Sequence, residues 1–249
     1  LEAGSLAVDD LCDLIRSLAM NPPNEAPSTD SGKHDSFSIG DTTLDRYAGQ
    51  YQLGDWYVLA VSRHGSTLFV DMPAREHIEL RPTGECDFEL IDVAGQTVTF
   101  DKKADGTVSA LRLRMSGGEG VAVRIDSQAA EHVRARLAAR IKDQKPLQGS
   151  NAAVRRLVEG LISGHPNYDE MLPVLAHAAK QQLYQLHTTA AFLGPIKSID
   201  FQGVGSQGYD VYDVLQERGT SRVRIMQRSD GLIASALFSV KDSPVSLGP

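Results

Sequence analysis

Apolar and polar residues alternate in short runs over Leu44–Ile125, which is the pattern of half-buried β-strands. The first run is Leu44–Leu53, in which Tyr47, Gly49 and Tyr51 fall on one face. Seven further runs follow, separated by turn signals such as Asp105-Gly106: Tyr57–Ser62, Leu68–Asp71, Glu76–Leu80, Asp87–Ile91, Thr97–Phe100, Val108–Arg114 and Gly120–Ile125. Consecutive strands with no helix between them predict an all-β, eight-stranded antiparallel barrel, because closure removes the unpaired sheet edges.

The C-terminal part of the chain has a different order, in which helical periodicity comes first. Apolar residues recur at helical spacing over Asn151–Ile162 and Asp169–Thr188, and Pro173 falls in the first turn of the second helix. Four strand-like runs follow: Ile196–Val204, Tyr209–Glu217, Ser221–Arg228 and Leu232–Val240. Two helices followed by a four-stranded antiparallel sheet predict an α+β domain in which the helices cover one sheet face.

Three other segments complete the predicted organisation. An amphipathic helix is expected within residues 1–20, and residues 21–43 are rich in Pro, Ser, Asn, Asp and Gly, as in a linker. Residues 127–150 predict a helical connector with an apolar stripe (Ala130, Val133, Leu137 and Ile141) and a solvated basic face (Arg134, Arg136, Arg140 and Lys142). We therefore expect a barrel domain over residues 44–126 and an α+β domain over residues 151–243.

Composition excludes some classes of function. The 249 residues contain 25 Lys and Arg against 32 Asp and Glu, and the net charge of −7 argues against a nucleic-acid-binding surface. No apolar run approaches the roughly 20 residues that cross a bilayer, so no membrane span is expected. Cys12 and Cys86 fall in segments of different predicted type, and we expect free thiols rather than a disulfide.

Motifs that would carry chemistry are weak. Residues Gly203-Val204-Gly205-Ser206-Gln207-Gly208 nearly match the nucleophile elbow Gly-x-Ser-x-Gly, but they lie between two predicted strands, where a β-turn is expected. The chain has no His-x-x-x-His pair and no Gly-x-x-x-x-Gly-Lys loop. We expect no metal and no cofactor.

The barrel segment resembles a known family. The order of its residues is similar to that of the lipocalin-like domain on the C-terminal side of serine β-lactamase and penicillin-binding-protein-like hydrolases. The residues that carry the resemblance are Leu44, Tyr47-Ala48-Gly49-Gln50-Tyr51, Leu68, Leu80-Arg81-Pro82, Phe88, Val98-Thr99-Phe100, Asp105-Gly106 and Val108 to Leu111. The resemblance implies an upstream serine hydrolase domain in the same polypeptide, with residues 1–20 as its closing helix, and is compatible with a periplasmic or a cytoplasmic protein.

The catalytic elements of that family do not occur in this chain. No Ser stands three residues before a Lys, and no Lys-Thr-Gly is present, so no catalytic residue is assigned. We expect this chain to be inert towards β-lactams and D-amino-acid peptides. The leading expectation is a non-catalytic accessory region that modulates substrate access or assembly.

The second domain resembles, by element order, the cystatin-like cone shared by nuclear transport factor 2 (NTF2) and ketosteroid isomerase. The resemblance implies a cavity between helices and sheet, near which Tyr168, Tyr184, His187, Asp200, Tyr209 and Tyr212 would gather. Trp56, the only tryptophan, sits at a hairpin corner, where it is a lid over the barrel core or a ligand platform. Our candidate ligand-binding residues are Trp56, Tyr184, His187 and Tyr209.

Two alternatives stay open beside the accessory region. One is a small-molecule-binding protein that uses the barrel or the cone, and the other is a ketosteroid-isomerase-like enzyme in the second domain. The partners that these alternatives allow are a small-molecule ligand and a second copy of the chain in a homo-oligomer.

Overall fold

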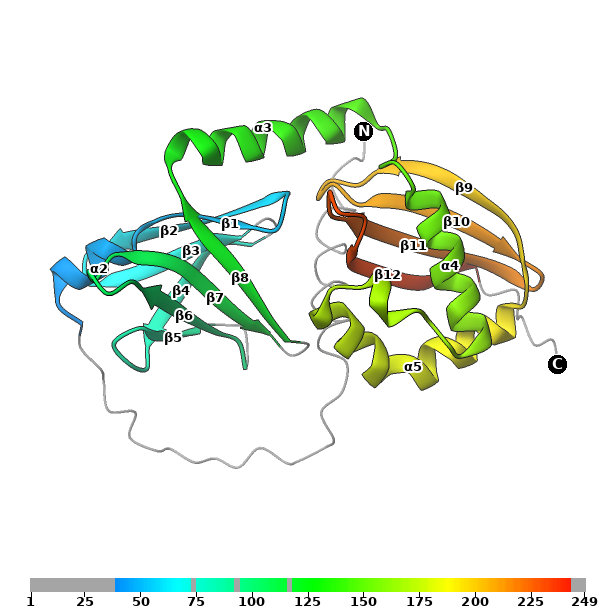
Figure 1. Cartoon of the computed structure of the whole chain (residues 1–249), viewed down its shortest axis with the longest axis horizontal. Helices are drawn as coiled ribbons and strands as arrows, with labels where there is room; N and C mark the ends of the chain where they lie inside the picture. Colours follow the sequence, from blue (N-terminus) through cyan, green and yellow to red (C-terminus); the bar gives the residue numbers. More distant parts are fainter. Residues whose placement is uncertain (1–38, 73–74, 92–94, 116–117, 243–249) are drawn as a thin grey trace. The chain divides into compact units, whose positions relative to one another are not determined.

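The computed structural model describes residues 39–72, 75–91, 95–115 and 118–242 (Figure 1). The chain divides into two compact units, the first ending at Arg136 and the second beginning at Leu137. The helix predicted within residues 1–20 and most of the predicted linker lie outside the described residues. In the part of the chain that is described, no helix is long and apolar enough to cross a membrane.

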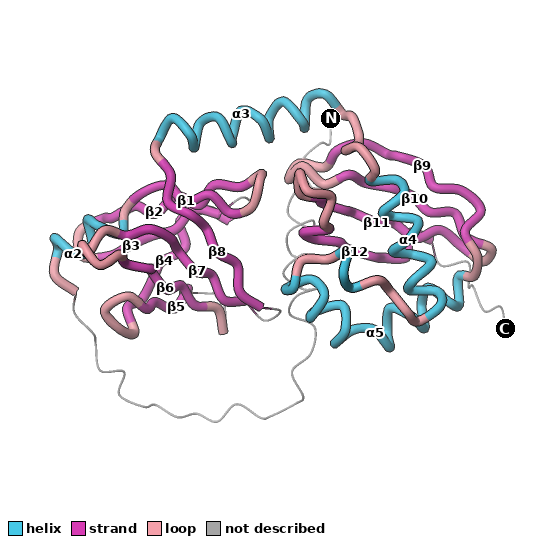
Figure 2. The backbone as a smooth tube through the Cα atoms, in the orientation of Figure 1, coloured by secondary structure: helices cyan, strands magenta, loops and turns pink. Residues whose placement is uncertain are grey.

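The first unit is a closed antiparallel barrel whose eight strands follow chain order (Figure 2). Each strand pairs with the next, and β1 also pairs with β8, where Gln50 faces Ile125. The prediction of an eight-stranded antiparallel barrel is confirmed. The strands are β1 (Gly49–Leu53), β2 (Tyr57–His64), β3 (Thr67–Met72), β4 (Arg75–Pro82), β5 (Asp87–Leu90), β6 (Thr97–Lys102), β7 (Val108–Met115) and β8 (Gly118–Ile125).

The predicted start of the first strand is wrong. The chain forms a short helix, α2 (Asp41–Tyr47), and β1 begins only at Gly49. Leu44 and Tyr47 lie three residues apart, so one face of the helix buries both in the barrel core. Alternation between Tyr47 and Tyr51 suggested a continuous strand, but the helix ends between them.

The second unit is a four-stranded antiparallel sheet in the order β12-β11-β10-β9, with α4 and α5 packed on one face. Figure 1 shows α4 crossing the sheet. This confirms two helices and a separate four-stranded antiparallel sheet. The elements are α4 (Ser150–Ser163), the 3₁₀ turn η1 (Tyr168–Glu170), α5 (Pro173–Leu193), β9 (Ile196–Val204), β10 (Asp210–Gln216), β11 (Gly219–Gln227) and β12 (Ile233–Asp242).

Helix α5 begins and ends later than predicted. Pro173 occupies its first turn, where no intrahelical donor is required, and the preceding residues 168–170 form a separate 3₁₀ turn. The C-terminal end is set by Gly194, whose φ of 82° is readily adopted by glycine. Thr188 and Thr189 do not end the helix, because its buried face continues to Ala190 and Leu193.

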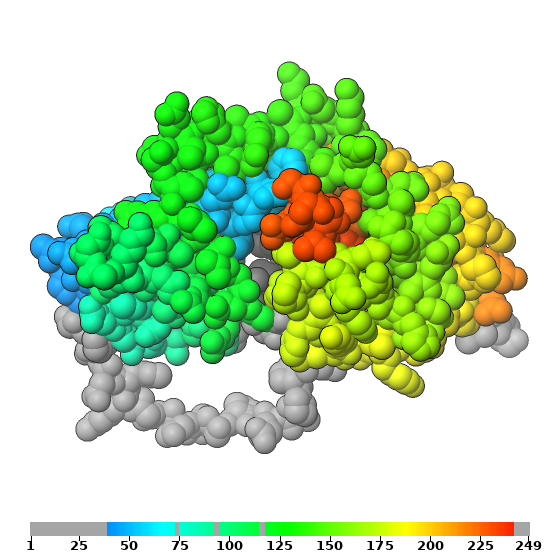
Figure 3. Space-filling view, viewed as in Figure 1, coloured from blue at the N-terminus to red at the C-terminus, as the bar shows by residue number. Residues whose placement is uncertain are grey.

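One parallel contact occurs outside the named strands, which are all paired antiparallel. It is an isolated bridge between Met171 and Ile233, in which Leu172 N donates to Ile233 O at 2.9 Å. In Figure 3 the orange-red residues near the β11–β12 turn lie against the yellow-green residues before α5, as this bridge requires. The bridge attaches the segment before α5 to the β12 edge of the sheet.

Helix α3 (Ser127–Asp143) begins in the first unit and ends in the second. Ala130 and Val133 of its predicted apolar stripe are buried, and Leu137 and Ile141 are half-buried. The prediction that Arg140 lies on a solvated face is wrong, since its residue exposure is only 9%. The reason is an acidic partner distant in sequence, Asp210, which binds its guanidinium.

Candidate functional site

Aromatic side chains fill the middle of the barrel. The Tyr47 ring stacks on Phe100 with a centroid distance of 4.4 Å, and Phe88 meets both rings edge-on at 5.7 and 5.5 Å. Tyr51 adds a fourth ring, 5.9 Å from Phe100, and none of the four residues is more than 2% exposed. The barrel interior around these rings is therefore a packed core rather than a ligand cavity.

The two tyrosine hydroxyls in this core have backbone partners. Tyr51 Oη donates to Tyr47 O at 2.6 Å, and Tyr47 Oη donates to Glu85 O at 2.7 Å. Burial raises the pKa of Tyr51 to about 12 and also raises the pKa of Tyr47. Both groups therefore stay neutral phenols at physiological pH and act as hydrogen-bond donors within the fold.

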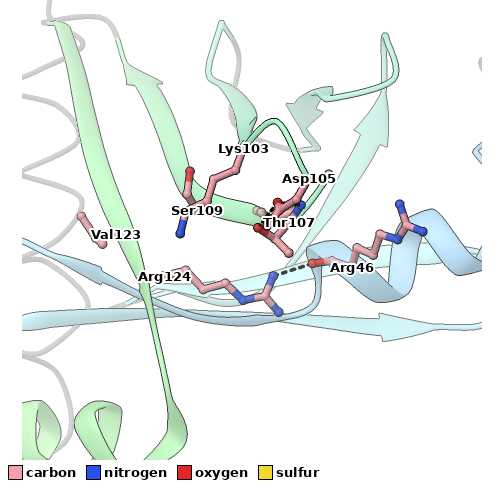
Figure 4. Close-up of a pocket in the computed structure, with 9 residues that line it drawn as sticks. Arg46, Lys103, Asp105, Thr107, Ser109, Val123 and Arg124 are labelled. Atoms are coloured by element: carbon pink, nitrogen blue, oxygen red, sulfur yellow. Dashed lines mark hydrogen bonds between the residues drawn. The ribbon is translucent and has the colours of Figure 1, made fainter.

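A basic pocket of about 760 Å³ lies on the outside of the barrel (Figure 4). Its walls come from the end of α2, the β6–β7 turn and strands β7 and β8, which are distant in sequence. Three cationic side chains and one carboxylate line it on a protein whose net charge is −7. Its lining residues are Arg46, Lys103, Asp105, Gly106, Thr107, Val108, Ser109, Val123 and Arg124.

Arg124 is the fixed element of the basic pocket. Its Nη1 donates to Arg46 O at 2.6 Å and its Nη2 donates to Ala48 O at 2.7 Å, while the guanidinium lies 5.7 Å from the Tyr51 ring centroid. A Cβ at Gly49 would come within 3.0 Å of Nη2, so glycine leaves room for this side chain. Since both hydrogen-bond acceptors are carbonyl groups, they position the guanidinium without neutralising its charge.

The other two cations of the basic pocket are exposed. Among the described residues, the side chains of Arg46 and Lys103 have no hydrogen-bond or ion-pair partner. The turn that carries Lys103 is held by Lys103 N to Thr107 O at 2.8 Å and Gly106 N to Lys103 O at 2.9 Å. Hydrogen bonds from Thr107 to Asp105 lower the pKa of this carboxyl group, so Asp105 is ionised and offsets one of the three positive charges.

A buried polar network fixes the start of β10 in the second unit. Arg140 Nη2 lies 2.7 Å from Asp210 Oδ1, and these side chains are 7% and 0% exposed. Asp210 Oδ2 accepts from Leu147 N at 2.9 Å, and Ser150 Oγ lies 2.6 Å from Tyr212 Oη. Because both Asp210 oxygens have partners, this network stabilises the fold and leaves no carboxylate oxygen free to act as a base.

A second acidic centre lies on β10. Asp213 accepts from Arg222 Nε at 2.9 Å and from Lys241 Nζ at 2.6 Å. Burial alone would raise the pKa of Asp213, but the hydrogen bonds from these two cations outweigh burial, and the pKa lies below its ordinary value. Asp213 is therefore an ionised strand-to-strand link rather than a proton-transfer group.

The four candidate ligand-binding residues occupy different surroundings. Trp56 is half-buried in the β1–β2 turn of the barrel unit, with the Arg136 guanidinium 5.7 Å from its ring centroid. Tyr184 on α5 is 82% exposed. His187 Nδ1 lies 2.9 Å from Leu161 O and links α5 to α4, while Tyr209 is 6% exposed and donates to Ser235 Oγ at 3.1 Å.

Within the second unit, the three candidates differ in exposure and partners. Tyr184 faces solvent, so it lines no enclosed cavity, whereas His187 and Tyr209 are engaged with groups of the fold. Of the other residues expected at the cone site, Tyr168 packs against the core that contains Tyr212, with Lys180 Nζ 4.7 Å from its ring centroid, and Asp200 accepts from Ser198 Oγ at 2.8 Å. Ligand binding by Trp56, Tyr184, His187 or Tyr209 stays a prediction.

The described ranges contain no group of three or more His, Cys, Asp or Glu side chains placed to hold a metal ion. Cys86 is a half-buried free thiol, and Cys12 lies outside the described residues. No local pattern in the sequence indicates the basic pocket, because Arg46, Lys103 and Arg124 come from separate segments that line one pocket only in the folded barrel. No protein-family model matches this chain, and no curated protein matches it.

Proposed function

We propose that this chain is a non-catalytic accessory region of a serine β-lactamase-like hydrolase, with a lipocalin-like barrel and a cystatin- or NTF2-like α+β unit. In this role it modulates substrate access to an upstream catalytic domain, or the assembly of that domain. The filled barrel interior carries the proposal, since four packed aromatic rings occupy the space that a ligand container would need to leave open. The proposal that the chain belongs with serine β-lactamase-like hydrolases rests on the resemblance of residues 44–125 to the lipocalin-like domain of that family.

The polar groups of the second unit support a non-catalytic role. A ketosteroid-isomerase-like reaction needs a carboxylate base and donors directed at one substrate oxygen. Here Asp210 is bound by Arg140 and Leu147, and Asp213 is bound by Arg222 and Lys241. Because both carboxylates are occupied by partners within the fold, neither is free to approach a substrate, and the accessory role is preferred to the enzyme.

The small-molecule carrier is also less well supported. A carrier of the barrel type would place its ligand among inward-facing side chains, where Tyr47, Tyr51, Phe88 and Phe100 are buried. Ligand contacts of the barrel would then have to be made on its outer surface.

The proposal is tested first with the reading frame upstream of Leu1. It is expected to encode a Ser-x-x-Lys hydrolase domain, and deletion of residues 44–249 from the full-length protein is expected to change substrate range or oligomeric state. A second deletion, of residues 137–249 alone, separates the contribution of the barrel from that of the α+β unit. Unchanged substrate range and unchanged oligomeric state after the larger deletion would contradict the accessory role.

The same proposal predicts that this chain has no serine hydrolase activity of its own, which can be assayed directly. Nitrocefin and p-nitrophenyl ester hydrolysis should stay at background, and a fluorophosphonate probe should label no serine stoichiometrically. Stoichiometric labelling of one serine, with turnover lost on its substitution by Ala, would show that the chain is itself an enzyme.

A further inference from the structure

We infer that the basic pocket on the outside of the barrel binds the phosphate group of a small phosphate monoester. The inference does not depend on the accessory role, because it rests only on the side chains of the barrel unit. Arg46, Lys103 and Arg124 line the pocket together with a single carboxylate, Asp105.

Charge defines the class of ligand. With three cations and one ionised carboxylate, the lining has two positive charges in excess. A phosphate monoester carries about −1.5 to −2 at pH 7, which matches this excess, whereas a monocarboxylate carries only one negative charge. Guanidinium groups also match the geometry of phosphate oxygens through paired N–H donors.

Donor availability points the same way. A guanidinium has five N–H groups, and the hydrogen bonds of Arg124 to Arg46 O and Ala48 O use two of them. The exposed side chains of Lys103 and Arg46 make no hydrogen bond or ion pair with another described residue, and Lys103 interacts with Asp105 only through its charge. Figure 4 shows the Lys103 and Ser109 side chains beside the start of the Arg124 side chain, the Arg124 guanidinium directed towards Arg46 O, and the Arg46 side chain extending to the other side of the pocket. An incoming anion would therefore pair with donors that make no competing ion pair.

Pre-organisation adds to this argument. The two carbonyl acceptors and the Tyr51 ring fix the Arg124 guanidinium before any ligand arrives, and the closed turn Lys103–Thr107 fixes the backbone of Lys103. Ordering these groups therefore costs little of the binding free energy. Arg46 lacks such hydrogen bonds from its side chain, which is exposed.

The remaining lining indicates an organic ester rather than inorganic phosphate alone. A volume of about 760 Å³ is far larger than a phosphate group needs. Val123 is 56% exposed and offers apolar surface to the organic part, whereas Val108 is only 5% exposed and belongs to the barrel core.

The test uses the full chain and phenyl phosphate as the probe, with binding measured by calorimetric titration. Inorganic phosphate is compared as the same anion without an organic group. Benzoate is compared as an aromatic anion with a single negative charge. Vesicles of phosphatidylcholine with and without phosphatidic acid form a separate arm, because a lipid headgroup presents the same phosphate monoester. The variants are Lys103→Gln and Arg46→Gln, and the control is Arg114→Gln, which removes an equal charge from a side chain 72% exposed at the other end of β7.

We expect saturable binding of phenyl phosphate that weakens with ionic strength and exceeds the binding of benzoate. Each pocket variant should weaken it about tenfold, as for one charge-assisted hydrogen bond, while Arg114→Gln leaves it unchanged. Saturable binding to phosphatidic acid vesicles alone, lost in the pocket variants, would identify the headgroup as the source of the same phosphate chemistry. No binding in either arm, or binding that the pocket variants do not weaken, would overturn the inference and leave the accessory role untouched.

Discussion

The side-chain amide of Gln144 pairs with both backbone groups of Val204. Its Nε2 donates to Val204 O at 2.9 Å, and its Oε1 accepts from Val204 N at 2.9 Å. Val204 ends β9, an edge strand of the sheet, so a side chain continues the ladder where no further strand exists. Gln144 has a φ of 51°, an uncommon conformation for a residue other than glycine, and this pairing offsets its cost.

Replacing Gln144 should therefore destabilise the second unit. Gln144→Ala removes both hydrogen bonds and leaves a partly buried backbone pair without its partner, so we expect a loss of about 1–3 kcal/mol in the free energy of unfolding. Urea unfolding followed by circular dichroism measures the loss. The exposed Gln148→Ala is the control, and equal effects of the two substitutions would contradict a role for the pairing.

Breaking the ion pair between Arg140 and Asp210 should lower the free energy of unfolding more than Gln144→Ala does. Asp210→Asn leaves the buried Arg140 guanidinium without a carboxylate, and breaking such a pair typically costs about 3–5 kcal/mol. The double variant Arg140→Met with Asp210→Asn should recover part of the loss, because no buried charge then remains. A double-mutant cycle with purely additive losses would show that the two residues are not coupled.

Trp56 allows this loss to be assigned to one unit. It is the only tryptophan and lies in the barrel unit, so its fluorescence reports the unfolding of the barrel. We expect Asp210→Asn to lower the urea concentration at the midpoint of the unfolding transition seen by circular dichroism. The midpoint reported by Trp56 fluorescence, which follows the barrel unit, should stay unchanged. Simultaneous loss of both signals at the lower urea concentration would mean that the two units unfold as one.

Gly208 and Gly231 form a matched pair of positions. Both have positive φ, 82° and 85°, but a Cβ at Gly208 would lie 2.6 Å from Leu137 Cδ1, whereas a Cβ at Gly231 meets nothing within 4 Å. Gly231→Ala should lower the free energy of unfolding by about 1 kcal/mol, because alanine is strained in the left-handed conformation. Gly208→Ala should cost about 1–3 kcal/mol more, because it also forces the packing of Leu137 apart. Thermal unfolding measures both losses of stability. Equal losses for the two substitutions would contradict a steric contribution at Gly208.

The raised pKa of Tyr51 predicts that the barrel loses stability at alkaline pH. The folded pKa of about 12 lies above the ordinary value of 10.0, so folding favours the protonated phenol. This contribution is fully present below about pH 10 and is lost as the pH rises through about 12. The two-unit difference corresponds to about 2–3 kcal/mol for this buried side chain.

Tyr51→Phe tests this dependence. It should cost about 1 kcal/mol at neutral pH, through the lost hydrogen bond to Tyr47 O, but should flatten the alkaline part of the stability profile. Trp56 fluorescence during urea unfolding, repeated from neutral pH upwards, provides the measurement. Tyr184→Phe, at a residue that is 82% exposed, controls for the loss of one tyrosine. A variant as alkali-sensitive as the parent would argue against Tyr51 as a source of the effect.

The periodic parts of the fold were predictable from sequence because local rules decide them. Ile196–Val204 was predicted with the bounds that the structure has, and Asp105-Gly106 forms the expected turn, with Gly106 at a φ of 81°. Leu44–Tyr47 could not be settled locally, because Tyr47 fits a period of two with Gly49 and Tyr51 and a spacing of three with Leu44. Burial against the barrel core decided in favour of the helix.

Features set by tertiary contacts were out of reach. Nothing near Arg140 in sequence indicates that Asp210 will neutralise it, so a charge at a helix position was interpreted as solvated. The candidate site has the same limit, since Arg46, Lys103 and Arg124 come from α2, the β6–β7 turn and β8. Residue type alone likewise did not indicate that Tyr184 would be 82% exposed and Tyr209 only 6% exposed.

Closure of the barrel has a kinetic consequence. Seven of its eight strand pairings join neighbours in sequence and can form as local hairpins, whereas the β1–β8 pairing joins Gln50 to Ile125. The entropy lost in closing so long a loop must be offset by contacts that form at the same time. We expect β1 and β8 to associate late, so substitutions at their interface should mainly accelerate unfolding, while those in the Asp105-Gly106 hairpin should slow refolding.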